Sequence, residues 1–575
     1  MAHFHIKKKN GRPYLYVREI ARINGKPTVI SQIYIGSPKR TAALLNSQKK
    51  EPIKFKAEQF GSLWLAQQMD KNINLVEIVD GIIPKKKNEE GPSVGEYFLY
   101  CVWNRMVKAV SKNKMPQWYK QTAIQHIRPI EINELTSQRY WEKWERVSEK
   151  DINEIARQFF QRIWEVESPK ADCLLFDTTN YYTFMANHTK SQLARRGKNK
   201  EGRHHLRQVG LGLLVARNSR LPLYYCVYPG NLHDSRLFEK VMGEMFAVAC
   251  ALNNTSQRLT VVIDKGMNSE NNYTCIDQHS RIHFITTYSP YFSKNLAATP
   301  LERFEPLDIS KNRLLEEDGI PQERLLAYRT KGKFWGNQRT VVVTYNPATA
   351  RKQNYSLNSK LETIRQQLLS MRVKYRDRKP HWRNPKVIKE RYLMLCERLH
   401  LSSEFYMLEF VKSKGGVEAM GFRKNAYRIE QTRVMFGKNI IITDNIDWTT
   451  GEIVEASLDR WEVEDRFRLS KNEDLVSTRP IRHWTDSKIR CHLFTCVVAL
   501  TYLRRLELCL ERCGIHRTAE DVMKDMRNFH SVLYMFRGER NPKRCLEEPT
   551  KTQAEVLHAL GYYVDGNGVL QPLKS

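Results

Sequence analysis

The 575-residue sequence lacks the features that would place it in a membrane or in a secreted class. Its longest apolar stretches, such as residues 493–503, fall well short of the roughly 20 residues that a membrane-spanning helix needs. The opening residues contain no apolar signal-peptide core, and neither internal repeats nor low-complexity segments are evident. We therefore expect a cytoplasmic globular protein with no membrane partner.

Cysteine is present, but it lacks the spacing of a zinc site or a disulfide framework. The 11 cysteines are scattered and odd in number, with no Cys-x2-Cys motif and no paired Cys/His spacing. Several stand among apolar neighbours, as Cys173 and Cys226 do. We therefore expect reduced thiols with a structural role.

Acidic residues are too few to balance the basic ones. The chain has 94 Lys and Arg against 63 Asp and Glu, which gives a formal charge of +31. A surplus of this size creates a field that concentrates polyanions, and nucleic acid is the usual one. A merely soluble basic protein is the alternative explanation of the charge. The length allows two to four structural units.

The first part of the chain combines a small sheet with a helical region. Asn10-Gly11 and Asn24-Gly25 are hairpin-turn dipeptides between runs of strand formers, so we expect an antiparallel sheet within residues 1–50. The pattern of residues 51–168 is helical. Ser148 stands at capping-box spacing from an acid, ahead of one apolar helical face made of Ile152, Ile155, Ala156, Phe159, Phe160 and Ile163.

A strand-rich unit follows at residues 169–289. The sequence predicts a strand at 173–176, hairpin strands at 209–216 and 221–228, a helix opened by Asp234, and strands at 259–263 and 283–287. This order is that of a ribonuclease-H-like α/β core.

We expect the core to be interrupted by a β-rich insertion domain. Residues 290–447 contain expected strands at 340–345, 426–429 and 439–443, and basic helices at 361–372 and 387–400. The second part of the core would then be 448–515, with helices at 458–471 and 485–513. Residues 516–575 are expected to form a helical C-terminal tail.

Two aspartates follow the expected core strands. Asp177 ends the first and Asp264 ends a later one, so adjacent parallel strands would place both at one sheet edge. Phosphodiester cleavage by two metal ions requires carboxylates that converge from different elements. Mg²⁺ takes one or two carboxylates together with water and substrate phosphate. A turn or capping role is the alternative for each aspartate.

A third acid lies on an expected helix. Arg460, Glu464 and Lys471 would form one narrow stripe at 100° per residue, with Arg468 close to it. A solvated row of salt bridges has the same appearance. On the functional alternative, Glu464 is a metal ligand and the neighbouring cations contact DNA phosphates.

The segment LDRWEVEDRFRLSKNEDLVSTRPIRHW resembles the signature of bacterial insertion-sequence transposases of the Asp-Asp-Glu type. It is most similar to the group named for insertion sequence four, whose pattern is Tyr-x2-Arg-x3-Glu-x6-Lys. Arg460, Glu464 and Lys471 fit that spacing, whereas Ser457 occupies the position of the tyrosine, which the family links with contact to the transposon end. RPIRHW and the N-terminal Tyr-Ile-Gly resemble one elongated subgroup.

The resemblance extends over residues 5–530 and includes FDTTNYYTF around Asp177 and VIDKGMNS around Asp264. It implies a cut-and-paste transposase in which Asp177, Asp264 and Glu464 are catalytic and bind two Mg²⁺, for which Mn²⁺ can substitute. The implied partners are the terminal inverted repeats and target DNA, bound by a homodimer in a synaptic complex. A hairpin intermediate and association with the bacterial nucleoid would accompany this.

Further DNA contacts are expected from a cationic run. Arg195, Arg196 and Lys198 lie in a segment that suits a DNA-binding loop, although an exposed polar loop would look the same. The helical region 51–168 would be an accessory, DNA-end-binding domain. Two other functions remain open: a ribonuclease-H-like nuclease without strand transfer, and a non-catalytic DNA-binding protein derived from a transposase.

Overall fold

The computed structural model describes residues 2–573 except 10–11, 24, 38–40, 42–51, 171, 187–188, 198–201, 233, 253–258, 280, 413–417 and 537–539. The chain forms two compact units. The first contains residues 1–259 and 461–575, and the second contains residues 260–460. The described helices include none with the length and apolar composition of a membrane span.

The predicted N-terminal sheet is confirmed. Strands β1 (Ala2–Lys9), β2 (Arg12–Ile23) and β3 (Lys26–Gly36) pair antiparallel in that order. Gly25 lies in the second turn with a φ of 78°, a conformation that glycine adopts without steric cost. The dipeptide Asn10-Gly11 lies outside the described residues.

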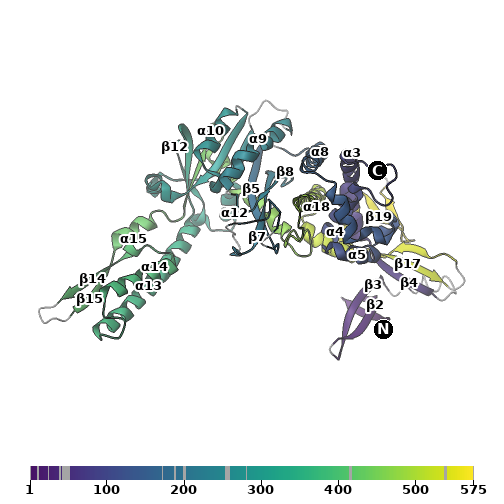
Figure 1. Ribbon diagram of the computed structural model, residues 1–575, viewed down its shortest axis with the longest axis horizontal. Helices are drawn as coiled ribbons and strands as arrows, with labels where there is room; N and C mark the ends of the chain where they lie inside the picture. The colour runs from purple at the N-terminus through teal and green to yellow at the C-terminus, as the bar shows by residue number, and fades with distance from the viewer. Residues whose placement is uncertain are drawn as a thin grey trace. The chain divides into compact units, whose positions relative to one another are not determined.

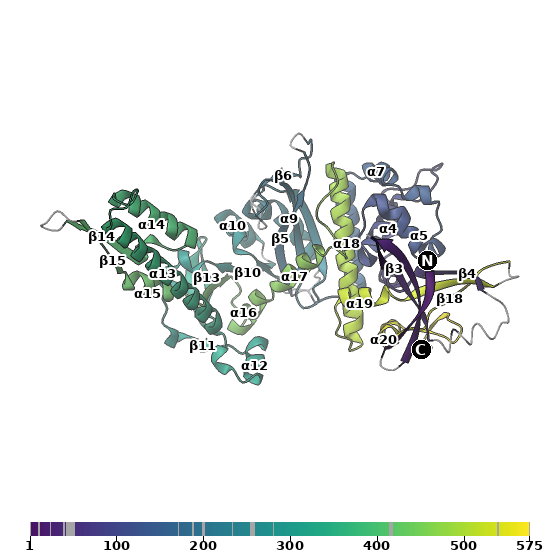
Figure 2. The same cartoon turned by 90° about the horizontal axis from the view of Figure 1, so that it is seen from below.

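The helical region of the first unit surrounds one long helix. Ser148 and Asp151 form the predicted capping box of α8 (Glu149–Glu167), and all six residues of the predicted apolar face are buried. The long helix α18 (Asp486–Arg512) packs against several others, as Figure 2 shows for its neighbour α4. The other helices here are α2 (Gly61–Asp70), α3 (Leu75–Ile82), α4 (Val94–Val107), α5 (Met115–Gln121), α6 (Ile124–Ile127) and α7 (Ser137–Glu145).

The first unit also holds part of the predicted core. Strand β5 (Cys173–Thr183) pairs antiparallel with β7 (Arg207–Ala216), which also pairs with β8 (Pro222–Pro229) and with the two-residue β6 (Arg195–Arg196). The predicted hairpin of β7 and β8 and the helix α9 (Asp234–Leu252) are therefore confirmed.

The C-terminal region is not the helical tail that we expected. Helices α19 (Ala519–Met526) and α20 (Lys551–Ala559) alternate with β17 (His530–Phe536) and β18 (Lys543–Leu546). Strand β17 pairs with β18 and with β4 (Pro52–Gln59), which comes from the other end of the chain. Such long-range pairing leaves no local signal in the sequence. A last hairpin consists of β19 (Tyr562–Val564) and β20 (Leu570–Pro572).

The second unit contains a sheet with the strand order β11-β12-β13-β16-β10-β9. Its strands are β9 (Leu259–Ile263), β10 (Ile282–Tyr288), β11 (Glu305–Pro306), β12 (Leu326–Phe334), β13 (Asn337–Tyr345) and β16 (Lys438–Thr443). Strand β16 pairs antiparallel with both β10 and β13. The expected boundaries of the insertion, 290 and 447, are therefore wrong, because β12, β13 and β16 continue the sheet. Helices α10 (Glu270–Gln278), α11 (Lys294–Ala297), α12 (Ser310–Glu317) and α16 (Thr450–Leu458) accompany it.

The segment between β13 and β16 forms a largely helical module rather than a β-rich domain. Helices α13 (Pro347–Arg376) and α14 (Pro385–Leu399) form an antiparallel pair beside the hairpin of β14 (Tyr406–Lys412) and β15 (Glu418–Lys424), as Figure 1 shows. Residues 426–429, expected to be a strand, begin helix α15 (Ala426–Arg433). The module has its own buried core, which includes Leu361, Ile364, Leu368, Ile388 and Tyr406.

Candidate active site

Asp264 directly follows the buried strand β9, as the sequence predicts. Its carboxylate caps the short 3-10 helix η3 (Lys265–Met267) and accepts a hydrogen bond from the Gly266 N–H at 3.4 Å. The capping role that the sequence left as an alternative is therefore present. The cap uses one oxygen of the carboxylate and leaves the other for a further partner.

That other oxygen contacts Arg460, which lies 196 residues further along the chain. Arg460 Nη1 donates to Asp264 Oδ1, and the two side chains are 23% and 24% exposed. Burial acts to raise the pKa of Asp264, but the charge and hydrogen bond of Arg460 outweigh it and leave the pKa below its usual value. Asp264 is thus ionised at neutral pH and accepts but does not donate hydrogen bonds.

Asp177 lies within a strand and not at its end. Strand β5 continues to Thr183, and Asp177 stands opposite Leu213 of β7. The β-branched and aromatic residues after Asp177 favour this continuation. The side chain is 7% exposed, and its Oδ1 accepts a hydrogen bond from the Thr178 N–H at 2.8 Å.

Glu464 is exposed on α17 (Trp461–Ser470), a helix that packs against β5 within the first unit. The predicted stripe on this helix is not formed, because Arg460 precedes its first residue and Lys471 follows its last. The chain turns at residues 459–460 between α16 and α17. Arg468 is on the helix, but its guanidinium pairs with Asp465 at 2.7 Å.

The sequence did not indicate the residues that fix α17 in place. Tyr181 Oη of β5 and Ser470 Oγ are 2.6 Å apart and share a buried hydrogen bond at the end of the helix. The Lys471 ammonium lies 6.0 Å from the centre of the same tyrosine ring. Tyr181 lies in the motif FDTTNYYTF and Ser470 lies in the signature segment, but neither motif indicated that the two side chains meet. These contacts hold the signature helix against the strand that carries Asp177.

The cationic run before β7 is partly described. Arg196 is exposed and Arg195 is half-buried on β6, whereas Lys198 lies outside the described residues. The backbone ahead of β6 is held by Asp486 at the start of α18, whose carboxylate accepts a hydrogen bond from the Gln192 N–H at 2.9 Å. The two arginines therefore stand on an anchored edge strand of the sheet.

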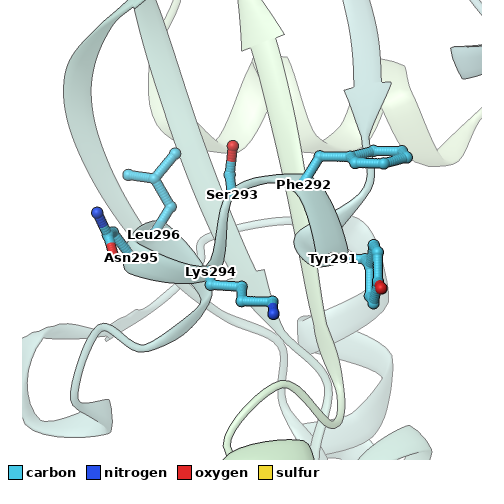
Figure 3. A pocket seen from close by; sticks show the side chains of 6 residues that line it. All are labelled: Tyr291, Phe292, Ser293, Lys294, Asn295 and Leu296. Atoms are coloured by element: carbon cyan, nitrogen blue, oxygen red, sulfur yellow. The ribbon is translucent and has the colours of Figure 1, made fainter.

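No three His, Cys, Asp or Glu side chains stand together as a metal-binding group in the part of the chain that the structure describes. Asp177 and Glu464 belong to the first unit, and Asp264 belongs to the second. Figure 3 shows a hollow in the second unit, lined only by residues 291–296 and containing two exposed aromatic rings, Tyr291 and Phe292. It contains none of the predicted site residues.

Comparison with known proteins identifies the family. The family model described as Transposase DDE domain matches residues 182–502, which is more than half of the chain. The match includes Asp264 and Glu464, and it begins five residues after Asp177. No curated protein matches the sequence.

A solved structure, the cryo-EM structure of a piggyBac transposase synaptic complex with hairpin DNA, is 8% identical over 82% of each chain. Its TM-score of 0.33 is too low to define a shared fold. The family match stands by itself: the chain belongs to the Transposase DDE domain family and is a DDE transposase.

Proposed function

We propose that this transposase belongs to the insertion-sequence-four-like group, in its elongated subgroup, and cleaves DNA at the ends of an insertion sequence before joining them to target DNA. The family match supports a transposase of the DDE type. The spacing of Arg460, Glu464 and Lys471 supports the assignment to the group, although Ser457 occupies the tyrosine position. A ribonuclease-H-like core is part of the same proposal.

The contact between Arg460 and Asp264 carries the proposal. An arginine of the signature and an aspartate from a separate motif meet directly, although 196 residues separate them. The same ion pair at another place in the fold would be explained as a purely structural salt bridge. Here the aspartate ends a buried strand, and the arginine directly precedes the helix that carries Glu464. A guanidinium in this position can exchange its carboxylate partner for a DNA phosphate.

Asp177, Asp264 and Glu464 are the proposed metal ligands and catalytic residues. Their donor chemistry suits Mg²⁺, or Mn²⁺ in its place, because these ions prefer carboxylate oxygens and Asp264 is held in its ionised form. Two such ions would polarise the attacking and leaving oxygens of a phosphodiester. The protein itself contributes the placement of the carboxylates: strand β5 fixes Asp177, and η3 with Arg460 fixes Asp264.

The proposed DNA contacts are Arg195, Arg196, Lys198, Arg460, Arg468 and Lys471. Cations of this kind bind phosphates without reading sequence, so they would position terminal repeats and target DNA. Arg468 would have to leave Asp465 to reach a phosphate. A homodimer that holds both element ends, and association with the bacterial nucleoid, complete the proposal.

Strand transfer distinguishes this function from hydrolysis alone. We expect purified protein with Mg²⁺ to join a pre-cleaved oligonucleotide, bearing an element end with a free 3′-hydroxyl, to a supercoiled plasmid. The measurement is the appearance of joined product on a denaturing gel. Cleavage of intact element ends without any joined product would indicate a nuclease. Binding of DNA without cleavage or joining would indicate a non-catalytic DNA-binding protein derived from a transposase.

A further inference from the structure

The helical module between β13 and β16 carries an unusual share of the positive charge. Residues 347–433 contain 20 Lys and Arg against eight Asp and Glu, a net charge of +12 out of the +31 of the whole chain. The module is 87 residues long, so its charge density is more than double the average. None of the DNA contacts proposed above lies in it.

The charge is concentrated where α13 turns into α14. Residues 372–391 contain nine cations against two acids, and seven of the nine are exposed. We call these nine residues the basic turn: Arg372, Lys374, Arg376, Arg378, Lys379, Arg383, Lys386, Lys389 and Arg391.

Ion pairing differs between the basic turn and the rest of the module. Elsewhere in the module most arginines have an acidic partner: Glu362 pairs with Arg365, Glu404 with Arg428, Glu409 with Arg423 and Glu430 with Arg433. Within the basic turn, all of which the structure describes, only Arg376 forms an ion pair, with Asp377. The remaining charge is therefore uncompensated by protein acids, and like charges held this close repel one another unless an anion binds.

A backbone carbonyl and a tryptophan ring contact three of these cations, Lys374, Arg383 and Arg391. Arg378 and His381 adopt positive φ values of 48° and 64°, which non-glycine residues rarely do. Arg383 Nε donates a hydrogen bond to the Arg378 carbonyl at 2.7 Å. The Trp382 ring has the Arg391 guanidinium at 4.0 Å and the Lys374 ammonium at 4.6 Å. These contacts restrain Lys374, Arg383 and Arg391 before any ligand binds, which lowers the entropic cost of binding.

The length of helix α13 also separates the basic turn from the sheet of the second unit. Helix α13 begins two residues after β13 and has 30 residues. At about 1.5 Å per residue it spans about 45 Å, or roughly 13 base pairs of duplex DNA at about 3.4 Å each. The core between α13, α14 and β15 holds both helices along their length.

We propose that the basic turn binds the sugar-phosphate backbone of duplex DNA more than one helical turn away from the DNA that meets the sheet. This inference rests on the proposed function, which supplies DNA as the substrate. The surface offers guanidinium and ammonium groups, which contact phosphates and read no sequence. These phosphate contacts increase the affinity for DNA and fix the position of a flanking segment of the duplex on the protein.

The test replaces four exposed cations of the turn that form no side-chain hydrogen bond: Arg378→Gln, Lys379→Gln, Lys386→Gln and Lys389→Gln. Binding to a 40-base-pair duplex is measured from 50 to 200 mM salt. We expect affinity to fall more than tenfold at the low-salt end. The slope of log affinity against log salt should become shallower by about three to four, because four phosphate contacts are lost.

The control removes the same charge from the same module outside the turn: Lys352→Gln, Arg365→Gln, Arg423→Gln and Arg428→Gln. All four side chains are exposed. Both variants should retain the wild-type unfolding midpoint, because none of the eight residues belongs to the module's buried core. Hydroxyl-radical footprinting of the duplex should show that only the turn variant loses protection more than about 10 base pairs from the cleavage position.

Equal affinity, slope and footprint in the two variants would overturn the inference while leaving the proposed function intact, provided that the wild-type protein binds and cleaves element ends. If the wild-type protein does not bind DNA, the inference about the basic turn and the proposed function are both wrong. If the turn variant loses binding to anionic phospholipid vesicles and keeps its affinity for DNA, the basic turn binds membrane lipids instead of DNA, and the inference is also wrong.

Discussion

Asp264→Asn is expected to abolish DNA cleavage while leaving DNA binding nearly unchanged. Asparagine has the shape of aspartate but lacks its charge, so it neither holds a divalent cation well nor pairs with Arg460. We expect the cleavage rate to fall by about a thousand-fold or more, which corresponds to about 4 kcal/mol of transition-state stabilisation. Single-turnover cleavage of a labelled element end and a gel-shift titration measure the two properties.

Asp308→Asn is the matched control, because Asp308 lies in the same unit, pairs with Arg313 and is 81% exposed. It should retain cleavage. Asp177→Asn and Glu464→Gln should reproduce the defect of Asp264→Asn. Retained cleavage in Asp264→Asn would refute its catalytic role, and retained cleavage in either of the others would remove that residue from the proposed site.

The second large effect concerns salt. With a charge of +31, the protein should bind DNA mainly through phosphate contacts that release counterions. If six to ten phosphates are contacted, affinity should fall by about 10³- to 10⁵-fold between 50 and 200 mM salt. Fluorescence anisotropy with a labelled duplex measures this dependence. A flat response would mean that the charge has another purpose, and the DNA-binding proposal would then be wrong.

Local signals in the sequence were sufficient for much of the fold. The Ser148 capping box fixed the start of α8, and its apolar periodicity identified the buried face residue by residue. Strand β9 and the aspartate after it followed from a short run of β-branched residues. In each case the decisive information lies within a few residues of the element itself, which is the range over which capping and periodicity act.

Elements that depend on distant partners were missed. Strands β17 and β18 form because β4, more than 450 residues away in sequence, completes their sheet. Asp177 was placed at a strand end because the apolar run 173–176 stops just before it, whereas pairing with β7 extends the strand to Thr183. Residues 340–345 and 439–443 were recognised as strands, but their shared sheet could not be seen from either one.

The candidate site was predictable in its residues and not in its geometry. The sequence indicated Asp264 and Arg460 separately, and only the fold shows that they touch. The stripe predicted for Glu464 requires one helix from 458 to 471, and the turn at 459–460 interrupts that helix. The end of helix α17, directly before Lys471, is hydrogen-bonded through Tyr181 and Ser470, a buried pair from two different elements that no periodicity reveals.

We propose that the carboxylates of residues 177, 264 and 464 share their metal ions, and iron-directed cleavage of the polypeptide tests this proposal without relying on enzymatic activity. Protein loaded with Fe²⁺ in place of Mg²⁺ and treated with ascorbate and peroxide produces hydroxyl radicals that cut the backbone beside the bound ion. Fragments should end near all three residues at once, and excess Mg²⁺ should suppress every cut together. Cuts near only one of the three, or cuts that Mg²⁺ suppresses independently, would contradict a common site.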